Sequence, residues 1–268
     1  MKAKYYARLV SGLLAGGTAI AAASYATYAA ITWYRYGRVK HQMSGQESNA
    51  LLDLYIQEYE IAERHHVRVA APAEITFAAA CQMNLSQSAV IRALFKAREM
   101  TLSCAGSIFR RDFSARCETS RQQEETLQQK EFLAEMKELG WGLLAEIPGR
   151  EIVLGTVTQP WVAKTVFRAV PPEEFAAFHE PGYAKIAFTV LADPVGASES
   201  VARTETRVAT TDPFARARFR RYWSLVSPGV ILIRRTLLRD LKTEAERRTY
   251  ATCAAASSFR EGHVTTAP

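Results

Sequence analysis

The chain has 268 residues, 48% of them hydrophobic and 23% charged, with only 14 glycines and 10 prolines. This composition suits one packed domain with appendages and excludes a fibrous or wholly disordered chain. The net charge of +7 is uneven, because residues 1–46 and 212–248 each carry +6 and the remainder carries −5. Such a pattern argues against a nucleic-acid coat, no zinc-finger or RNP-like motif occurs, and we expect no nucleic-acid partner.

The N-terminal segment is apolar over a length that suits a membrane. From Leu9 to Tyr34 there are 26 residues without a charge. As a helix they would extend about 39 Å, against about 30 Å for the hydrocarbon core of a bilayer. Basic residues bracket the segment and aromatic residues lie near both ends, as at membrane interfaces. We therefore expect residues 1–36 to form a single-pass transmembrane helix, with the lipid bilayer as partner through residues 9–34.

Two questions about this segment stay open. A cleaved signal peptide is the alternative, although the segment is long for one and lacks a clear small-residue cleavage site. The two flanks are almost equally basic, so the charge pattern leaves the side of the membrane undetermined. Gly12 and Gly16 form a GxxxG pattern, which predicts a weak homodimer through close helix approach.

The rest of the chain divides into a linker, a domain and a tail. Residues 37–57 are polar and end in a short amphipathic stretch, so we expect a linker there. Residues 58–248 carry the folded domain, which includes a polar insertion at about 103–130. Residues 249–268 are small and polar without periodicity, which predicts a disordered tail.

Alternating residues and turn signals predict an antiparallel sheet after a first strand and two helices. From Glu60 to Ala70 the pattern alternates, and Pro72 then opens a helix. Further helices are expected at 88–100 and 132–141, and strands at 141–149, 151–161, 183–194 and 200–211. In the last strand, Arg203, Glu205 and Arg207 share one face, which predicts a charged network on the surface.

The final element is a long amphipathic helix. Asp212 is placed to cap it and Pro213 occupies its first position. Its apolar stripe needs a partner surface such as a sheet, and consists of Ala215, Phe219, Tyr222, Trp223, Val226, Val230, Ile233, Leu237 and Leu241. Ser227, Pro228 and Gly229 interrupt the stripe and predict a kink.

This order of elements resembles the START-like (SRPBCC) superfamily, which includes the Bet v 1 and polyketide cyclase groups. In HVRVAAPAEITFAAA a strand ends at Ala71 and Pro72, and Glu74, Ile75 and Phe77 follow at the start of a helix, as in that superfamily. TETRVATTDPFARARFRRYW resembles its last strand and C-terminal helix. The resemblance covers about Glu58 to Glu246, roughly 70% of the chain. The insertion and the N-terminal anchor depart from the pattern.

The resemblance implies an α+β helix-grip fold, in which a curved antiparallel sheet wraps around the long C-terminal helix. Here a single N-terminal transmembrane helix would precede it. Members bind lipids, sterols or polyketides in a cavity between sheet and helix, and some are cyclases or hydrolases. We therefore expect a membrane-tethered domain that binds an apolar or amphipathic small molecule. A cyclase- or hydrolase-like enzyme that uses a cavity histidine, and a non-catalytic interaction module with a filled core, are the alternatives.

Strand alternation and helix periodicity predict which residues would line this cavity. The expected ligand-binding residues are His65, Val67, Thr156, Thr158, Ile186, Phe188, Tyr222, Trp223 and Val226. His65 is also the candidate catalytic acid–base group, with a satisfied core histidine as the alternative. Adjacent strand residues point to opposite faces, so His65 and His66 do not form a shared metal site.

Other motifs point to no cofactor. Walker A, GxSxG, HExxH and strand-following GxGxxG patterns do not occur, so we expect neither a metal nor a cofactor. The cysteines form no CxxC pair, which predicts free thiols rather than a disulfide framework: Cys81, Cys104, Cys117 and Cys253.

Overall fold

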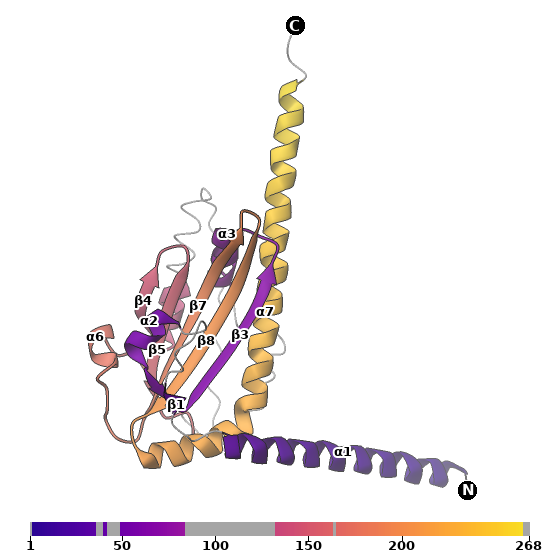
Figure 1. Ribbon diagram of the computed structural model, residues 1–268. Helices are drawn as coiled ribbons and strands as arrows, with labels where there is room; N and C mark the ends of the chain where they lie inside the picture. Colours follow the sequence, from indigo (N-terminus) through magenta and orange to yellow (C-terminus); the bar gives the residue numbers. More distant parts are fainter. Residues whose placement is uncertain (1, 36–39, 42–48, 84–131, 163–164, 265–268) are drawn as a thin grey trace.

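The computed structural model describes residues 2–35, 40–41, 49–83, 132–162 and 165–264 (Figure 1). A helix at 132–138 supplements the labelled elements. In chain order these are α1 (Lys2–Arg35), β1 (Lys40–His41), α2 (Ala50–Tyr55), β2 (Glu58–Tyr59), β3 (Ile61–Val69), α3 (Ala73–Cys81), β4 (Gly142–Ile147), β5 (Glu151–Thr158), β6 (Phe167–Arg168), α6 (Pro172–Phe175), β7 (Ala184–Gly196), β8 (Glu199–Thr210) and α7 (Pro213–Val264). The predicted helix at 88–100 and the insertion at 103–130 lie outside the described residues.

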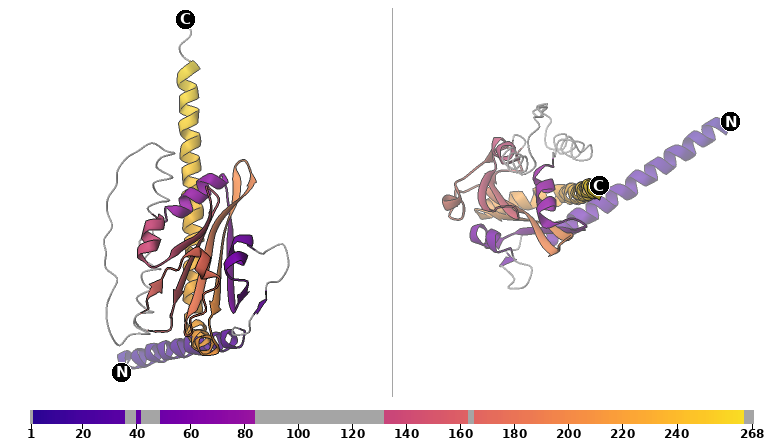
Figure 2. Two further views of the ribbon diagram at one scale, coloured as in Figure 1. Left: turned by 90° about the vertical axis from the view of Figure 1, so that its left-hand side faces the viewer. Right: turned by 90° about the horizontal axis from the view of Figure 1, so that it is seen from above.

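The main sheet is antiparallel and has the strand order β3-β8-β7-β5-β4, with β6 also paired to β5. The first strand of the domain therefore pairs with the last, which places Ile61 opposite Val208. The β4–β5 hairpin turns at the predicted Pro-Gly pair, where Gly149 has a φ of 69° that favours glycine. The sheet is curved and α7 runs along it (Figure 2), which is the arrangement of the helix-grip fold.

Different helices cover the two faces of the sheet. The face covered by α3, helix 132–138 and α7, here called the helix face, packs Ile152 against Phe77, and Val208 against Trp223. The opposite face, here called the back face, is covered by α2 and α6. Its core consists of Leu52, Ile56, Tyr59, Leu144, Val153, Val157, Val170, Phe175 and Ala187. The alternation predicted for β3 is confirmed, because Ile61 and Val69 are buried on the helix face.

The C-terminal helix begins as predicted and ends later than predicted. Asp212 Oδ1 accepts hydrogen bonds from the backbone N–H groups of Phe214 and Ala215, at 2.7 and 2.9 Å, and so caps α7. Pro228 lies inside the helix, which first runs along one end of the molecule and then bends to follow the sheet (Figure 1). The prediction of a disordered tail from residue 249 needs correction, because α7 continues to Val264. Residues 251–256, ATCAAA, are rich in alanine, the strongest helix former.

The end of the predicted linker is part of the domain. Leu52 and Ile56 are almost completely buried, and α2 packs on the back face of the sheet. Asn49 caps α2 by accepting a hydrogen bond from Leu52 N, and its side-chain amide donates to Glu151 at 2.5 Å. A linker over residues 37–57 is therefore wrong for residues 49–57, because their apolar residues supply core contacts that composition alone did not show.

The N-terminal segment is helical, as predicted, and forms α1. Among the residues that the structure describes, no helix combines the length and apolar character needed to cross a membrane. The predicted transmembrane span over residues 9–34 is therefore not supported. The homodimer expected through Gly12 and Gly16 stays a prediction.

Candidate functional site

A polar cluster lies on the helix face where β3 pairs with β8. The strand register places His65 opposite Thr204, and Glu63 opposite Thr206. On the other side of β8, the β7 strand places Val190 beside Thr204, and Phe188 beside Thr206. Polar side chains at the β3 edge thus continue into apolar side chains toward the middle of the sheet, which suits a molecule with one polar and one apolar end.

Arg234 of α7 adds a positive charge to this cluster. Its Nη1 donates to Thr204 Oγ1 at 3.3 Å. Burial lowers the pKa of Arg234 to about 10, an effect that the Glu63 carboxylate partly opposes. The guanidinium therefore remains charged near neutral pH although the side chain is half-buried.

His65 is held neutral by its surroundings. Its side chain is 13% exposed, and burial lowers its pKa below the usual 6.5, with the charge of Arg234 as a further cause. Nε2 of His65 lies 3.7 Å from Glu63 Oε2, a distance that would suit an ion pair only if the ring were protonated. Because the pKa is lowered, we interpret this as a contact of a neutral ring that is too long for a hydrogen bond.

Three polar atoms of the cluster are buried without a hydrogen-bond partner among the described residues. They are His65 Nε2, Thr206 Oγ1 and Arg234 Nε. Leaving a buried donor or acceptor unpaired costs about 1–3 kcal/mol, and such groups in folded proteins usually have a partner or a function. Their concentration at one place makes this cluster the candidate binding site.

The cluster borders a groove beside α7. A groove of about 460 Å³ separates β3 from this helix, and it is lined by Arg64, His65, His66, Val67, Arg235, Leu238 and Arg239. Two of the residues predicted to bind ligand, His65 and Val67, line it. The groove therefore reaches the polar cluster at His65.

The predicted ligand-binding residues lie on the helix face of the sheet and on α7, where they belong to more than one cluster. Ile186, Tyr222, Trp223 and Val226 pack in one cluster. Phe188 lies in the neighbouring cluster, where its ring meets Trp141 edge-on at 5.0 Å. Binding of ligand by these side chains stays a prediction.

The two predicted threonines have local partners. Thr156 Oγ1 donates to Gly140 O at 2.8 Å, and Thr158 Oγ1 donates to Val166 O at 2.8 Å. Both are fully buried. Their hydroxyl hydrogens thus join the sheet to the segments that flank it.

Sequence reasoning missed Arg234, Thr204 and Thr206. A usable signal existed in α7, because positions 230, 234, 238, 241 and 245 recur at helical spacing and form a line toward the sheet. An arginine in that line is a candidate for a buried charge. Among the described residues there is no group of three metal-ligating side chains.

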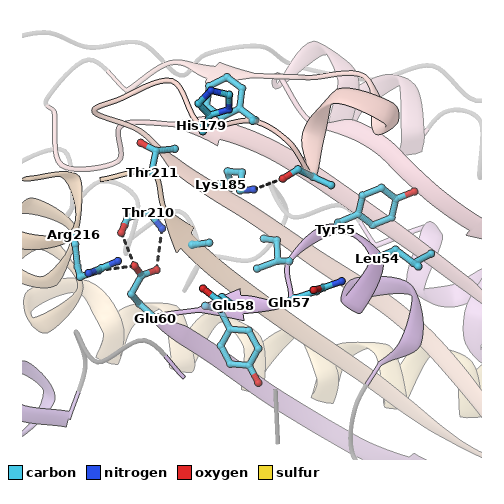
Figure 3. Close-up of a pocket in the computed structure, with 15 residues that line it drawn as sticks. Leu54, Tyr55, Gln57, Glu58, Glu60, His179, Lys185, Thr210, Thr211 and Arg216 are labelled. Carbon is cyan, nitrogen blue, oxygen red and sulfur yellow. Dashed lines mark hydrogen bonds and ion pairs between the residues drawn. The ribbon is translucent and has the colours of Figure 1, made fainter. Parts of the chain in front are cut away.

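A second hollow of about 460 Å³ lies on the back face, between α2, α6 and the start of α7 (Figure 3). Glu60 there accepts hydrogen bonds from Thr210 N, Thr210 Oγ1 and Arg216 Nε at 2.6 to 2.9 Å. Lys185 donates to Ala176 O at 2.9 Å, and burial lowers its pKa. Because Glu60 and Lys185 already have hydrogen-bond partners, this hollow is a weaker candidate for a ligand site than the polar cluster on the helix face.

Comparisons with known proteins add little to this geometry. No protein-family model and no curated protein matches the chain. One solved structure that is similar is the di-domain ARO/CYC BexL from the BE-7585A biosynthetic pathway, at 14% identity, 69% coverage of this chain and a TM-score of 0.24. The chain spans 46% of that protein's length.

A second similar structure is the Zhui aromatase/cyclase from Streptomyces sp. R1128. It shows 13% identity, 70% coverage of this chain, 95% coverage of that chain and a TM-score of 0.22. TM-scores this low do not support a conclusion about the fold or function of this chain. The fit to a helix-grip fold rests on the strand order and on α7 of this chain.

Proposed function

We propose that the protein binds an amphipathic small molecule between the helix face and α7. The molecule's acidic or oxygen-bearing end would meet Arg234 and Thr206, and its apolar body would lie over Phe188 and Val190. The observation that carries the proposal is the group of buried, unpartnered polar atoms beside a half-buried apolar surface. Burial of the ligand's apolar surface would contribute about 25 cal/mol of binding free energy per Å². The polar cluster would set the orientation of the ligand.

A matched pair of fluorescent probes tests this proposal. The anionic 8-anilinonaphthalene-1-sulfonate and the uncharged N-phenyl-1-naphthylamine have similar apolar bodies. Wild-type protein should bind the anionic probe more tightly and with 1:1 stoichiometry. Arg234→Met should lose this preference by about 10- to 100-fold, since hydrogen bonds to charged groups contribute about 1.5–3 kcal/mol.

The control is Arg247→Met, which removes an exposed arginine from the same helix. Both variants should remain folded, because the Arg234 side chain is only half-buried and Arg247 is exposed. Equal affinity of the wild type for both probes, or unchanged binding by Arg234→Met, would refute the proposal. Native mass spectrometry of the purified full chain, followed by organic extraction, would identify a bound natural ligand.

A cyclase-like enzyme is the second candidate, and the neutral state of His65 favours it. A neutral imidazole can accept a proton from a substrate hydroxyl or acidic C–H group, while Arg234 stabilises the resulting oxyanion. Glu63, at 3.7 Å, is near His65 without a hydrogen bond in this structure. With turnover, the species extracted from wild type and from His65→Gln should differ in mass, if water is lost after cyclisation, or in chromatographic retention, if the product is an isomer. Identical species would support binding without catalysis.

A further inference from the structure

One end of the molecule is built from α1 and the first segment of α7, residues 213–227; we call it the basal surface. Both segments lie at the end opposite the β7–β8 hairpin (Figures 1 and 2). Arg220 joins them, because its Nε donates to Trp33 O at 2.6 Å and its guanidinium lies 4.7 Å from the Trp33 ring centre. Tyr28 and Ser227 approach to 3.4 Å between their side-chain oxygens. The basal surface is therefore a joined unit of the fold.

The outer side of this surface exposes large apolar side chains. In the first segment of α7, Phe219 and Trp223 are buried against the sheet, whereas Phe214 is 82% exposed and Leu225 is also exposed. Helical spacing places Phe214, Arg218 and Leu225 on the side away from the sheet. On α1 the exposed apolar residues are Ile20, Tyr25, Ile31, Trp33 and Tyr34.

The same surface is strongly cationic. Residues 213–227 contain four arginines and no acidic residue. Arg216 is paired with Glu60, and Arg220 contacts Trp33. Arg218 and Arg221 are exposed and, within the described parts of the chain, have no ion pair. Their charges remain available to an anionic partner.

We propose that the basal surface binds to an anionic phospholipid bilayer. A second copy of the chain would bring like charges together, and a nucleic acid would leave the apolar side chains in water. A bilayer with acidic lipids provides phosphate and carboxylate groups for the arginines and an apolar layer for Phe214 and Leu225. This placement is independent of ligand binding on the helix face, so either proposal can fail alone.

Vesicle co-sedimentation of the full chain tests the charge contribution. Binding should be weak to phosphatidylcholine vesicles, strong to mixed phosphatidylcholine–phosphatidylserine vesicles, and reversed by high salt. Neutralising Arg218→Gln and Arg221→Gln together should weaken binding to the mixed vesicles about 30-fold. The matched control, Lys137→Gln with Arg247→Gln, removes two exposed charges elsewhere and should have little effect.

A second pair of variants tests the apolar contribution. Phe214→Ser should weaken binding, whereas Val195→Ser, which changes an exposed apolar residue of β7 at the opposite end, should not. Equal binding to neutral and acidic vesicles, release only by detergent, or insensitivity to both arginine changes would overturn the proposal. A dimer in solution that Phe214→Ser dissociates would instead assign this surface to a second copy.

Discussion

Arg207 offers a direct test of how the back face is held together. Its side chain is 0% exposed, and its Nη1 contacts Asp53 Oδ1 at 2.5 Å and Ile56 O at 2.8 Å. Its Nε donates to Glu205 at 2.7 Å, and its guanidinium lies 5.0 Å from the Tyr59 ring centre. These contacts fasten α2 to the sheet. We predict that Arg207→Met destabilises the protein substantially.

The size of the effect follows from what the substitution leaves behind. Breaking a buried ion pair by removing one partner costs about 3–5 kcal/mol. Glu205 would retain two contacts to Arg64 at 3.0 Å, and Asp53 is partly exposed and can be rehydrated. We therefore expect the lower end, about 3 kcal/mol, or a fall in Tm of about 6–12 °C.

Arg203→Met is the matched control on the same strand. Arg203 pairs with Asp193 at 2.9 Å, but its side chain is 50% exposed, so the expected loss is about 0–1 kcal/mol. Urea unfolding followed by circular dichroism gives both values, and hydrogen exchange should show faster opening of α2 in Arg207→Met alone. Losses that agree within about 1 kcal/mol would refute the reasoning, because burial would then not distinguish the two pairs.

Three further predictions concern packing, pH and thiol reactivity. Gly155→Ala would place a Cβ 2.4 Å from Leu144 Cδ1 and should cost about 1–3 kcal/mol by thermal unfolding, whereas Gly196→Ala, with nothing within 4 Å, should cost much less. Folding lowers the pKa of His65, so the unfolded chain binds that proton more readily than the folded chain. The free energy of unfolding should therefore fall as pH drops below about 6.5. If His65→Gln shows the same dependence of unfolding free energy on pH as the wild type, this prediction is wrong. Burial raises the pKa of the Cys81 thiol to about 12, so iodoacetamide followed by peptide mapping should label Cys81 only after denaturation.

Local patterns predicted most of the described elements. The alternation of β3, the Pro-Gly turn of the β4–β5 hairpin and the cap at Asp212 each depend on neighbouring residues, and each is confirmed. The shared face of His65, Phe188 and Trp223 also followed from periods of 2 and 3.6 residues. Such features need no knowledge of distant contacts.

The sequence by itself thus determined the element types and the side of the sheet on which most candidate residues lie. Only the tertiary structure decided which charges are buried. Arg207 has the same sequence pattern as the exposed Arg203, but α2, about 150 residues earlier in the chain, covers it. Arg234 likewise becomes part of the candidate site because α7, after its bend, runs past the β3–β8 pair (Figure 1). Burial depends on what packs above a residue, and no local periodicity contains that information.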